Sequence, residues 1–498
     1  MLTQLGNRFE FLVSRKRGLA ERQRTLRAAI DWSYRLLTPN VQHFFCQLCV
    51  FRGGWSLEAA EEVCNEPLAL DMLAQLRECS LITTVESESG IRFRMLEMLR
   101  EYAQSQLSPQ ELAILQERHA SFFVALAEEA KPHMTGQDQA LWLDRLEADL
   151  DNVRGVLRWS CSETGDVGAG LRIAAGYWHL WVVRGYVTEG RNWLNGLFGR
   201  DIQNQDAGIR AEVLHASGTM ALYEANDTVV RAHLEESLAI SRERGDVEKI
   251  ANTQARLATL AQHNRDYLTA RVLLEECLTI YRGLGNKRGI ANTQFRLGGI
   301  AYNLGDSLTA QKLMMESYPV LREVGDQRLL GSALLTLGSW ALEQEDYSAA
   351  QEYLEESLET FRAVGDQVGI AWALLNQGST ALALKDLTSA RERTLQSLAI
   401  FRKLSHPGNT TIAIEHLTHI TFHLGELVRA ARLWGAAERQ REEMGWGAIS
   451  SEFVHHAQAI AATREALGDD RAFDSAWQEG RAMTREQAVA YALEESGE

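Results

Sequence analysis

Hydrophobic positions in the middle of the chain follow the spacing of two successive helices. Ala291, Leu297 and Ile300 recur at helical intervals. Gly305 and Asp306 then interrupt the pattern; glycine suits the left-handed residue that ends a helix, and aspartate suits the cap that begins the next one. A second apolar run follows and also ends at a glycine–aspartate pair. The sequence therefore predicts a helix, a turn and a second helix.

This pair of helices recurs along the chain with a period of 40 residues. The glycines that end the units are Gly245, Gly285, Gly325 and Gly365. One pair cannot bury its apolar faces alone, so successive pairs are expected to stack into an α-solenoid. We count six units, which start near residues 211, 251, 291, 331, 371 and 411. Pro319 lies late in a second helix and is expected to kink or shorten it.

In four units a glycine stands 12 residues before a second small or short branched residue. The pairs are Gly218 and Val230, Gly298 and Ala310, Gly338 and Ala350, and Gly378 and Ala390. This spacing resembles the tetratricopeptide repeat (TPR), in which the two small residues let neighbouring helices approach closely. The period here exceeds the usual repeat of about 34 residues, which implies longer helices. Val230 and Thr418 replace the small residues expected in the first and last units, as is common in end units.

The N-terminal part of the chain has a different pattern. Residues 25–107 contain three or more amphipathic helical stretches, one of which begins at the capping residue Ser56. The segments LITTV and IRFRML follow, parted by ESESG, and they predict a β-hairpin. A last helix is expected over MLEMLREYAQSQL. Helices followed by a two-stranded wing are typical of a winged-helix domain.

Several stretches resemble the winged-helix and TPR half of bacterial NB-ARC-type STAND signalling ATPases. They are TLRAAIDWSY, VFRGGWSLEAAEEVC, RFRMLEMLREYA and WLDRLEADLDNVRGVLRW. The resemblance implies a regulator, often of transcription, in which the TPR units act as the sensor. Two features depart from that family. The phosphate-binding loop GxxxxGK[ST] does not occur in the sequence, and Leu96 replaces a histidine that reads ADP in the plant relatives, although leucine cannot donate a hydrogen bond to phosphate.

We therefore expect an all-α chain without the ATPase core: a TPR α-solenoid of about six 40-residue helix pairs, preceded by a winged-helix domain with a small β-hairpin. The expected parts are a remnant of the ATPase-core tail (1–20), the winged-helix domain (21–107), a helical, TPR-like linker (108–210), the TPR solenoid (211–450) and a C-terminal helical cap (451–498).

Composition narrows the possible functions. Only 6 of 498 residues are proline, which favours helices throughout. The net charge of −16 argues against a general polyanion binder. The 6 cysteines are too few for a disulfide framework in so long a chain, and neither a membrane span nor a signal peptide is recognisable. We expect a cytoplasmic protein with no membrane partner and no cofactor.

A basic run before the winged helix raises an alternative, a DNA-binding transcriptional regulator that uses its own winged helix. The run consists of Arg15, Lys16, Arg17, Arg22 and Arg24. Arg92, Arg94 and Arg100, around the wing, would add contacts. In the family that the chain resembles, this domain is a regulatory clamp on the ATPase. A solvated or interdomain basic face is therefore the favoured interpretation.

Two groups of residues have metal-ligand spacing. Cys46 and Cys49 form a CxxC pair that would need Cys64 and Cys79 to complete a zinc site. Because their segment, FFCQLCVF, is an apolar helical run, core cysteines are the favoured interpretation. A second group, made up of His416, His419 and His423, could share one helical face; a polar lining of the last repeat is favoured over a metal site.

The concave face of the solenoid is the best binding candidate, because the first helix of each TPR unit lines it. The predicted partner-binding residues are Asn252, Arg256, Thr259, Gln262, His263, Asn292, Phe295, Arg296, Tyr302 and Asn303. Arg256 and Arg296 could hold a carboxylate with paired hydrogen bonds. The alternative is that these two arginines pair with nearby glutamates of the scaffold.

No catalytic constellation, such as GxSxG or HExxH, occurs in the sequence. The sequence thus predicts a non-enzymatic sensor and scaffold. Its solenoid would bind a protein, peptide or small effector, and its winged helix would relay binding to an ATPase module in cis or in trans. An ATPase activity would require a P-loop domain upstream of Met1.

Overall fold

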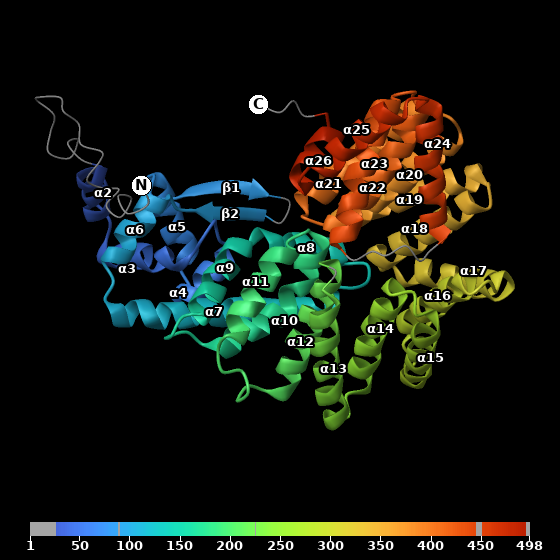
Figure 1. Ribbon diagram of the computed structural model, residues 1–498. Coiled ribbons are helices and arrows are strands. Elements are labelled where there is room, and N and C mark those ends of the chain that lie inside the picture. The colour runs from blue at the N-terminus through green and yellow to red at the C-terminus, as the bar shows by residue number, and fades with distance from the viewer. Residues whose placement is uncertain (1–25, 88–89, 225, 445–450, 495–498) are drawn as a thin grey trace, which may run out of the picture. The chain divides into compact units, whose positions relative to one another are not determined.

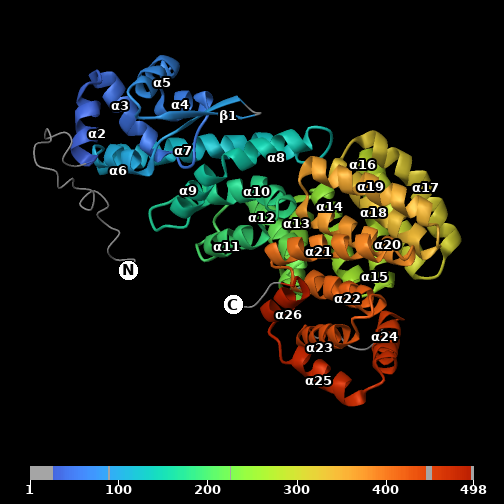
Figure 2. The same ribbon diagram turned by 90° about the horizontal axis from the view of Figure 1, so that it is seen from above.

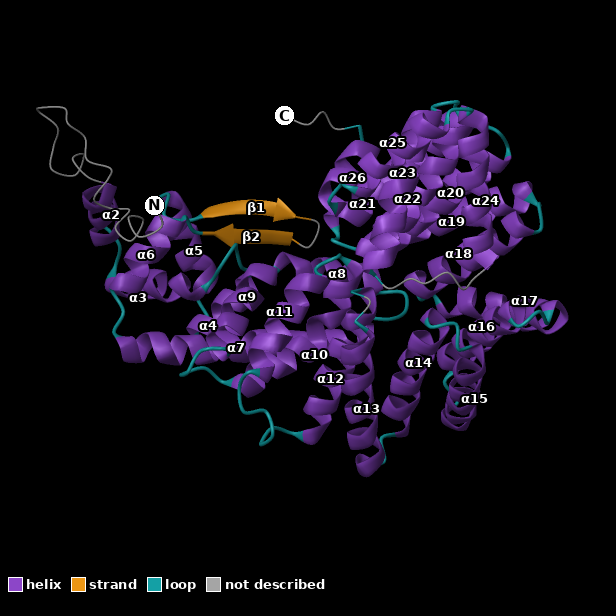
Figure 3. Ribbon diagram, viewed as in Figure 1, coloured by secondary structure: helices purple, strands orange, loops and turns teal. Residues whose placement is uncertain are grey.

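A computed structural model describes residues 26–87, 90–224, 226–444 and 451–494. Helices dominate it, and the only sheet in these ranges is two-stranded (Figure 3). The chain divides into two compact units built from interleaved segments. The first, here the N-terminal unit, comprises Met1–Met134, Leu141–Tyr177 and Asn192–Val213. The second, here the solenoid unit, comprises Thr135–Ala140, Trp178–Arg191 and Leu214–Glu498.

The N-terminal unit begins with short helices and a hairpin. In chain order the elements are α2 (Leu26–Arg35), α3 (Pro39–Gln47), a 3-10 turn η3 (Leu48–Val50), α4 (Leu57–Cys64), α5 (Ala69–Glu78), β1 (Thr83–Ser87), β2 (Gly90–Arg94) and α6 (Glu97–Ser105). Ser56 caps α4, because its hydroxyl accepts from the Ala59 N–H at 3.1 Å. The predicted capping serine and the order of helices, hairpin and helix are therefore found.

The predicted β-hairpin is present, and it is called the wing below. Its antiparallel register pairs Thr83 with Arg94 and Ser87 with Gly90. Trp55 pairs with β2 through an isolated β-bridge. Its N–H donates to the Phe93 carbonyl at 3.0 Å, and its carbonyl accepts from the Phe93 N–H at 2.9 Å. Trp55 is fully buried, so this bridge ties the wing to the helices beside it.

Further helices follow the wing. They are α7 (Pro109–Ala130), the 3-10 turn η4 (Lys131–His133), α8 (Gln139–Ala148), α9 (Leu150–Ser160), α10 (Val167–Val183), α11 (Val187–Phe198) and α12 (Ala207–Tyr223). A capping box between Ser108 and Glu111 starts α7. Close packing here depends on small residues; for example, a methyl group at Gly176 would lie 2.5 Å from the Ala127 carbonyl oxygen.

The solenoid unit continues as helix pairs that pack side by side from α13 onward (Figures 1 and 2). The helices are α13 (Asp227–Arg244), α14 (Val247–His263), α15 (Tyr267–Leu284), α16 (Lys287–Asn303), α17 (Ser307–Val324), α18 (Gln327–Glu343), α19 (Tyr347–Val364), α20 (Gln367–Ala383), α21 (Leu387–Lys403), α22 (Pro407–His423) and α23 (Leu427–Glu443). The fold class is therefore all-α, with the TPR-type solenoid that the period of 40 residues predicts.

The turns use the predicted capping chemistry. Gly245, Gly285, Gly325 and Gly365 have left-handed φ angles between 64° and 74°. Asp366, for example, caps α20, because its Oδ1 accepts from the Gly369 N–H at 2.9 Å. At the close approach within a pair, a methyl group at Gly298 would lie 2.6 Å from Met314 Cγ and 3.2 Å from the Ala310 carbonyl oxygen. The predicted small residues thus lie where the two helices meet.

Pro319 does not shorten its helix, so that part of the prediction is wrong. The helix α17 has 18 residues, as do α15 and α19 one repeat away on either side. A proline removes only one backbone donor, and Pro319 lies on the exposed side of the helix. The remaining hydrogen bonds of α17 are enough to carry it to Val324.

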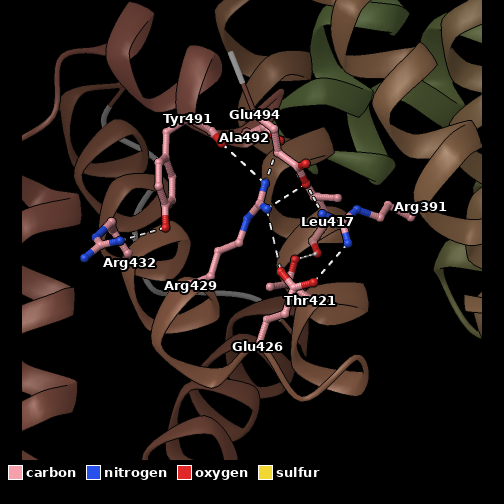
Figure 4. A network of polar contacts seen from close by, with 9 residues as sticks. All are labelled: Arg391, Leu417, Thr421, Glu426, Arg429, Arg432, Tyr491, Ala492 and Glu494. Carbon is pink, nitrogen blue, oxygen red and sulfur yellow. Dashed lines mark hydrogen bonds and ion pairs between the residues drawn. The ribbon is translucent and has the colours of Figure 1, made fainter. Parts of the chain in front are cut away.

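Three further helices end the described chain: α24 (Ser451–Leu467), α25 (Asp470–Arg481) and α26 (Arg485–Ala492). The last of them is held by arginines of the solenoid (Figure 4). Arg429 donates to the Ala492 carbonyl at 3.1 Å and to Glu494 Oε1 at 2.7 Å, and Arg391 pairs with the same carboxylate. Cations at the negative end of a helix stabilise it, so these contacts fix α26 against the last repeats.

Candidate functional site

The starts of the first helices in successive repeats are joined by ion pairs. Arg288 donates to Asp326 Oδ2 at 2.7 Å, and Arg328 donates to Asp366 Oδ2 at 2.9 Å. Each arginine reaches the capping aspartate of the next repeat, 38 residues further on. The side chains of Asp326 and Asp366 are only 2% and 4% exposed. Their free oxygens would otherwise lack a partner, so the arginines link neighbouring repeats.

Two residues from the start of the solenoid unit contact the helix starts that these ion pairs join. The Tyr223 hydroxyl accepts from Arg328 Nη2 at 2.8 Å, and the Tyr223 ring lies 5.7 Å from the His406 ring. A side chain at Gly365 would collide with the guanidinium of Arg184. Tyr223 and Arg184 therefore contact the beginnings of α18, α20 and α22. These contacts join the beginning of the solenoid unit to its later repeats.

Arg256 lies on the inner face of the solenoid unit, on α14. Burial lowers the pKa of its guanidinium; Tyr223 acts in the opposite direction, and Arg288 and Arg328 lower the pKa further. Among the residues that the structure describes, Arg256 forms no hydrogen bond and no ion pair. Since arginine stays charged at neutral pH, the inner face carries a cation that the scaffold does not neutralise.

Two histidines share this environment. Burial, followed by Arg256 and then Arg328, holds the pKa of His179 well below its usual value. Burial and Arg256 lower the pKa of His215 to about 3. The Nδ1 atom of His215 lies 3.1 Å from the Thr253 hydroxyl. Both imidazoles are therefore neutral at physiological pH and can hydrogen-bond without adding charge.

Arg296 occupies the same repeat position as Arg256 but is bound to the scaffold. Its guanidinium donates to the Ala255 carbonyl at 3.0 Å, to Thr259 Oγ1 at 2.9 Å and to Gln262 Oε1 at 2.7 Å. Burial and the neighbouring Arg256 lower the pKa of Arg296 to about 10. Thr259 and Gln262, two of the predicted binding residues, are thus partners of Arg296. These three partners are neutral, unlike the glutamates of the alternative interpretation.

The other predicted binding residues are spread over several environments. Asn252 accepts from the Tyr281 hydroxyl at 2.8 Å. Phe295 is buried in the core. Tyr302 hydrogen-bonds Glu343, and Asn303 donates to the Gly299 carbonyl of its own helix at 2.8 Å. In a last group, His263 is exposed and Asn292 is half-buried. The structure therefore does not bring most of the other predicted binding residues together with Arg256.

The groups with metal-ligand spacing have other contacts. Cys46, Cys49 and Cys64 are buried, whereas Cys79 is exposed. His416 Nδ1 lies 2.9 Å from the Ser379 hydroxyl. Over the part of the chain that the structure covers, no cluster of three or more His, Cys, Asp or Glu residues could hold a metal ion, and no helix is both long and apolar enough to span a membrane.

Most of the basic residues proposed for DNA contact either pair with a carboxylate or lie outside the residues that the structure describes. Arg92 pairs with Asp149 at 2.6 Å, and both side chains are largely buried. Arg100 is buried and pairs with Glu97. Arg94 is exposed. The basic run of Arg15, Lys16, Arg17, Arg22 and Arg24 lies outside the described residues. Leu96, which the sequence resemblance matches to a nucleotide-reading histidine, lies at the N-cap of α6.

Five residues of the inner face are not among the binding residues predicted from the sequence pattern: His179, His215, Tyr223, Arg288 and Arg328. A signal for the two arginines exists in the repeats. Where a repeat begins with a capping aspartate at 326 or 366, the position 38 residues earlier is arginine, whereas it is Glu248 before Asn286 and Val368 before His406. Only tertiary contacts bring His179 and Tyr223 to the same face, so no local pattern indicates them.

The comparisons with known proteins agree with the repeat. The tetratricopeptide repeat family model matches residues 249–323, 289–363 and 329–403. A curated protein of Mycobacterium tuberculosis, named as a candidate HTH-type transcriptional regulator, is 32% identical over 250 residues, which are 48% of this chain and 28% of the relative. A protein of the same description from Mycobacterium bovis matches equally. The match thus spans less than a third of these relatives.

Solved structures with similar arrangements include a STAND protein with a tetratricopeptide repeat sensor from Pyrococcus horikoshii. It has a TM-score of 0.43 at 15% identity, covering 84% of this chain and 65% of that one. The apo form of the quorum sensor NprR from B. thuringiensis has a TM-score of 0.40 at 12% identity, covering 70% and 99%. The match to the tetratricopeptide repeat family thus lies within residues 249–403 of this chain.

Proposed function

We propose that this chain is a ligand-capturing sensor of a signal-responsive transcriptional regulator. Its solenoid unit binds an effector, peptide or protein on the inner face, and the winged-helix part relays binding to an ATPase module in cis or in trans. The chain itself works by binding rather than by catalysis. The curated relatives support the regulatory output, since they are named as transcriptional regulators.

The observation that carries this proposal is the unneutralised guanidinium of Arg256. The chain has a net charge of −16, and its other inner-face arginines, 288, 296 and 328, all have bonds to the scaffold. A partly buried charge without a partner costs stability. Such a group is expected where a ligand supplies the missing partner.

The alternative, DNA binding through the wing, has weaker support. Arg92 and Arg100 are bound to Asp149 and Glu97, so a phosphate would have to displace a carboxylate to reach either of them. Phosphate contacts of free arginines supply most of the affinity in such complexes.

Transcript profiling of the native host tests the proposal. Deletion of the gene is expected to change a defined set of transcripts. Arg256→Gln, with protein levels checked by immunoblot, should change the same set. Arg242→Gln is the matched control, because it removes the same charge at an exposed position. A deletion that leaves all transcripts unchanged would refute the regulatory function.

A further inference from the structure

A comparison of two arginines one repeat apart shows what Arg256 lacks. Arg296 is held by the Ala255 carbonyl, Thr259 and Gln262, which lie 41, 37 and 34 residues earlier in the chain. The corresponding positions for Arg256 are His215, Thr219 and Leu222. Leucine offers no acceptor where Gln262 offers one. The sequence thus removes one of the three partners that hold Arg296.

The second partner is present but not used. The Thr219 hydroxyl is fully buried and has no hydrogen-bond partner, whereas the hydroxyl of Thr259 accepts from Arg296 at 2.9 Å. The hydrogen bond between a threonine and the arginine of the next repeat is therefore formed by Thr259 and Arg296 and absent between Thr219 and Arg256. Arg256 is not a scaffold residue of the kind that Arg296 is.

The surroundings of Arg256 are rich in donors. Arg288 and Arg328 lie near enough for their charges to act on it. Each of these two arginines is bound to an aspartate whose other oxygen caps a helix. The Tyr223 hydroxyl accepts from Arg328, which leaves its own proton available for donation. An anion beside Arg256 would therefore lie in the field of two further guanidinium groups and near a hydroxyl that can donate.

We infer that this inner face holds a binding site for an oxyanion, the phosphate or carboxylate group of a ligand, with Arg256 as its main donor and Tyr223 as a second. The planar guanidinium offers two parallel N–H groups, which match the oxygens of either anion. The inference rests on the proposed function for the presence of a ligand, and it adds the chemical group by which that ligand is recognised.

An anion site also explains why Arg256 has no carboxylate partner in the chain. A glutamate at the position of Leu222 would neutralise Arg256 and fill the space of the anion. Instead, the charged and titratable groups that act most strongly on Arg256 are Tyr223, Arg328, Arg288 and Tyr281. Neutral His179 and His215 complete this face.

Calorimetric titration of the full chain at low salt tests the inference. The probes are inorganic pyrophosphate, citrate, and the tripeptide Ala-Ala-Ala with either a free or an amidated C-terminus. Binding of pyrophosphate alone identifies a phosphate ligand. Binding of citrate, or of the free tripeptide but not its amide, identifies a carboxylate ligand.

Variants distinguish a specific binding site from general electrostatic attraction of anions. Arg256→Gln should weaken binding of the best probe at least about tenfold, as expected for loss of a charge-assisted pair, and should leave the melting temperature unchanged or raised. Arg242→Gln should bind as the wild type does. Arg296→Gln should lower the melting temperature because it breaks three bonds to α14.

Two results would overturn the inference: no heat of binding with any probe at millimolar concentration, or equal weakening by Arg256→Gln and Arg242→Gln. Neither result touches the transcript experiment. If probe binding fails while Arg256→Gln still changes the transcripts, the sensor function survives and recognition of an oxyanion does not.

Discussion

The ion pair between Arg328 and Asp366 allows a quantitative test of how the repeats are joined. The Asp366 side chain is 4% exposed, and its two oxygens have separate tasks: Oδ1 caps α20 through Gly369, and Oδ2 accepts from Arg328 at 2.9 Å. Removing the arginine leaves a buried carboxylate half satisfied. Breaking a fully buried pair costs about 3–5 kcal/mol. Because Arg328 is itself 30% exposed, water can reach part of the gap, and we expect Arg328→Gln to cost about 2–3 kcal/mol.

A double-mutant cycle separates the charge from the cap. Asp366→Asn keeps an acceptor for the helix start but leaves Arg328 without its carboxylate, at an expected cost of about 1 kcal/mol. The double variant carries neither charge, so it should be more stable than Arg328→Gln alone. The exposed pair of Arg322 and Glu356 is the control, since its side chains are 52% and 38% exposed; Arg322→Gln should cost less than about 1 kcal/mol.

Urea unfolding followed by tryptophan fluorescence gives these differences, provided that the slopes of the transitions agree. Hydrogen exchange at the start of α20 adds a local measure, because the Gly369 amide is bound by Asp366. The reasoning is wrong if Arg328→Gln costs no more than Arg322→Gln. It is also wrong if the double variant is less stable than Arg328→Gln.

Two further predictions concern single side chains. Gly298→Ala should destabilise the chain, because a methyl group there would lie 2.6 Å from Met314 Cγ, whereas Gly299→Ala, with nothing within 4 Å, should stabilise it by about 0.5–1 kcal/mol; equal melting temperatures would contradict this. Burial lowers the pKa of His119 to about 4 from its usual 6.5, so its contribution to stability is complete above pH 6.5 and is lost as the pH falls towards 4. At pH 5 the loss is about 2 kcal/mol; His119→Gln should flatten the fall of the melting temperature between pH 7.5 and 5, and an unchanged slope would refute the assignment.

Much of the fold could be predicted because its signals are local. Glycine at a left-handed helix end and aspartate at the next helix start act within a few residues, as at Gly365 and Asp366. Their recurrence every 40 residues reveals the repeat without any knowledge of packing. The wing was recognisable for the same reason, since its two strands and its turn are adjacent in the sequence.

The candidate site was only partly predictable. Arg256 and Arg296 look alike in the sequence, at the same position of near-identical segments, ANTQARL and ANTQFRL. Their difference depends on residues 34 to 41 positions earlier, where Leu222 takes the place of Gln262. A residue pattern on one helix cannot show which acceptors the first helix of the preceding repeat offers.

The sequence by itself determined the helix pairs, their caps and their period, because these follow from backbone conformation and spacing within each repeat. Only the tertiary structure decided which inner-face cations are neutralised. Tyr223 comes within hydrogen-bond distance of Arg328, 105 residues later, since the stacked repeats curve until early and late helices meet. That curvature sums small rotations over many repeats, so no single segment contains the information that places Arg256 among donors without a partner of its own.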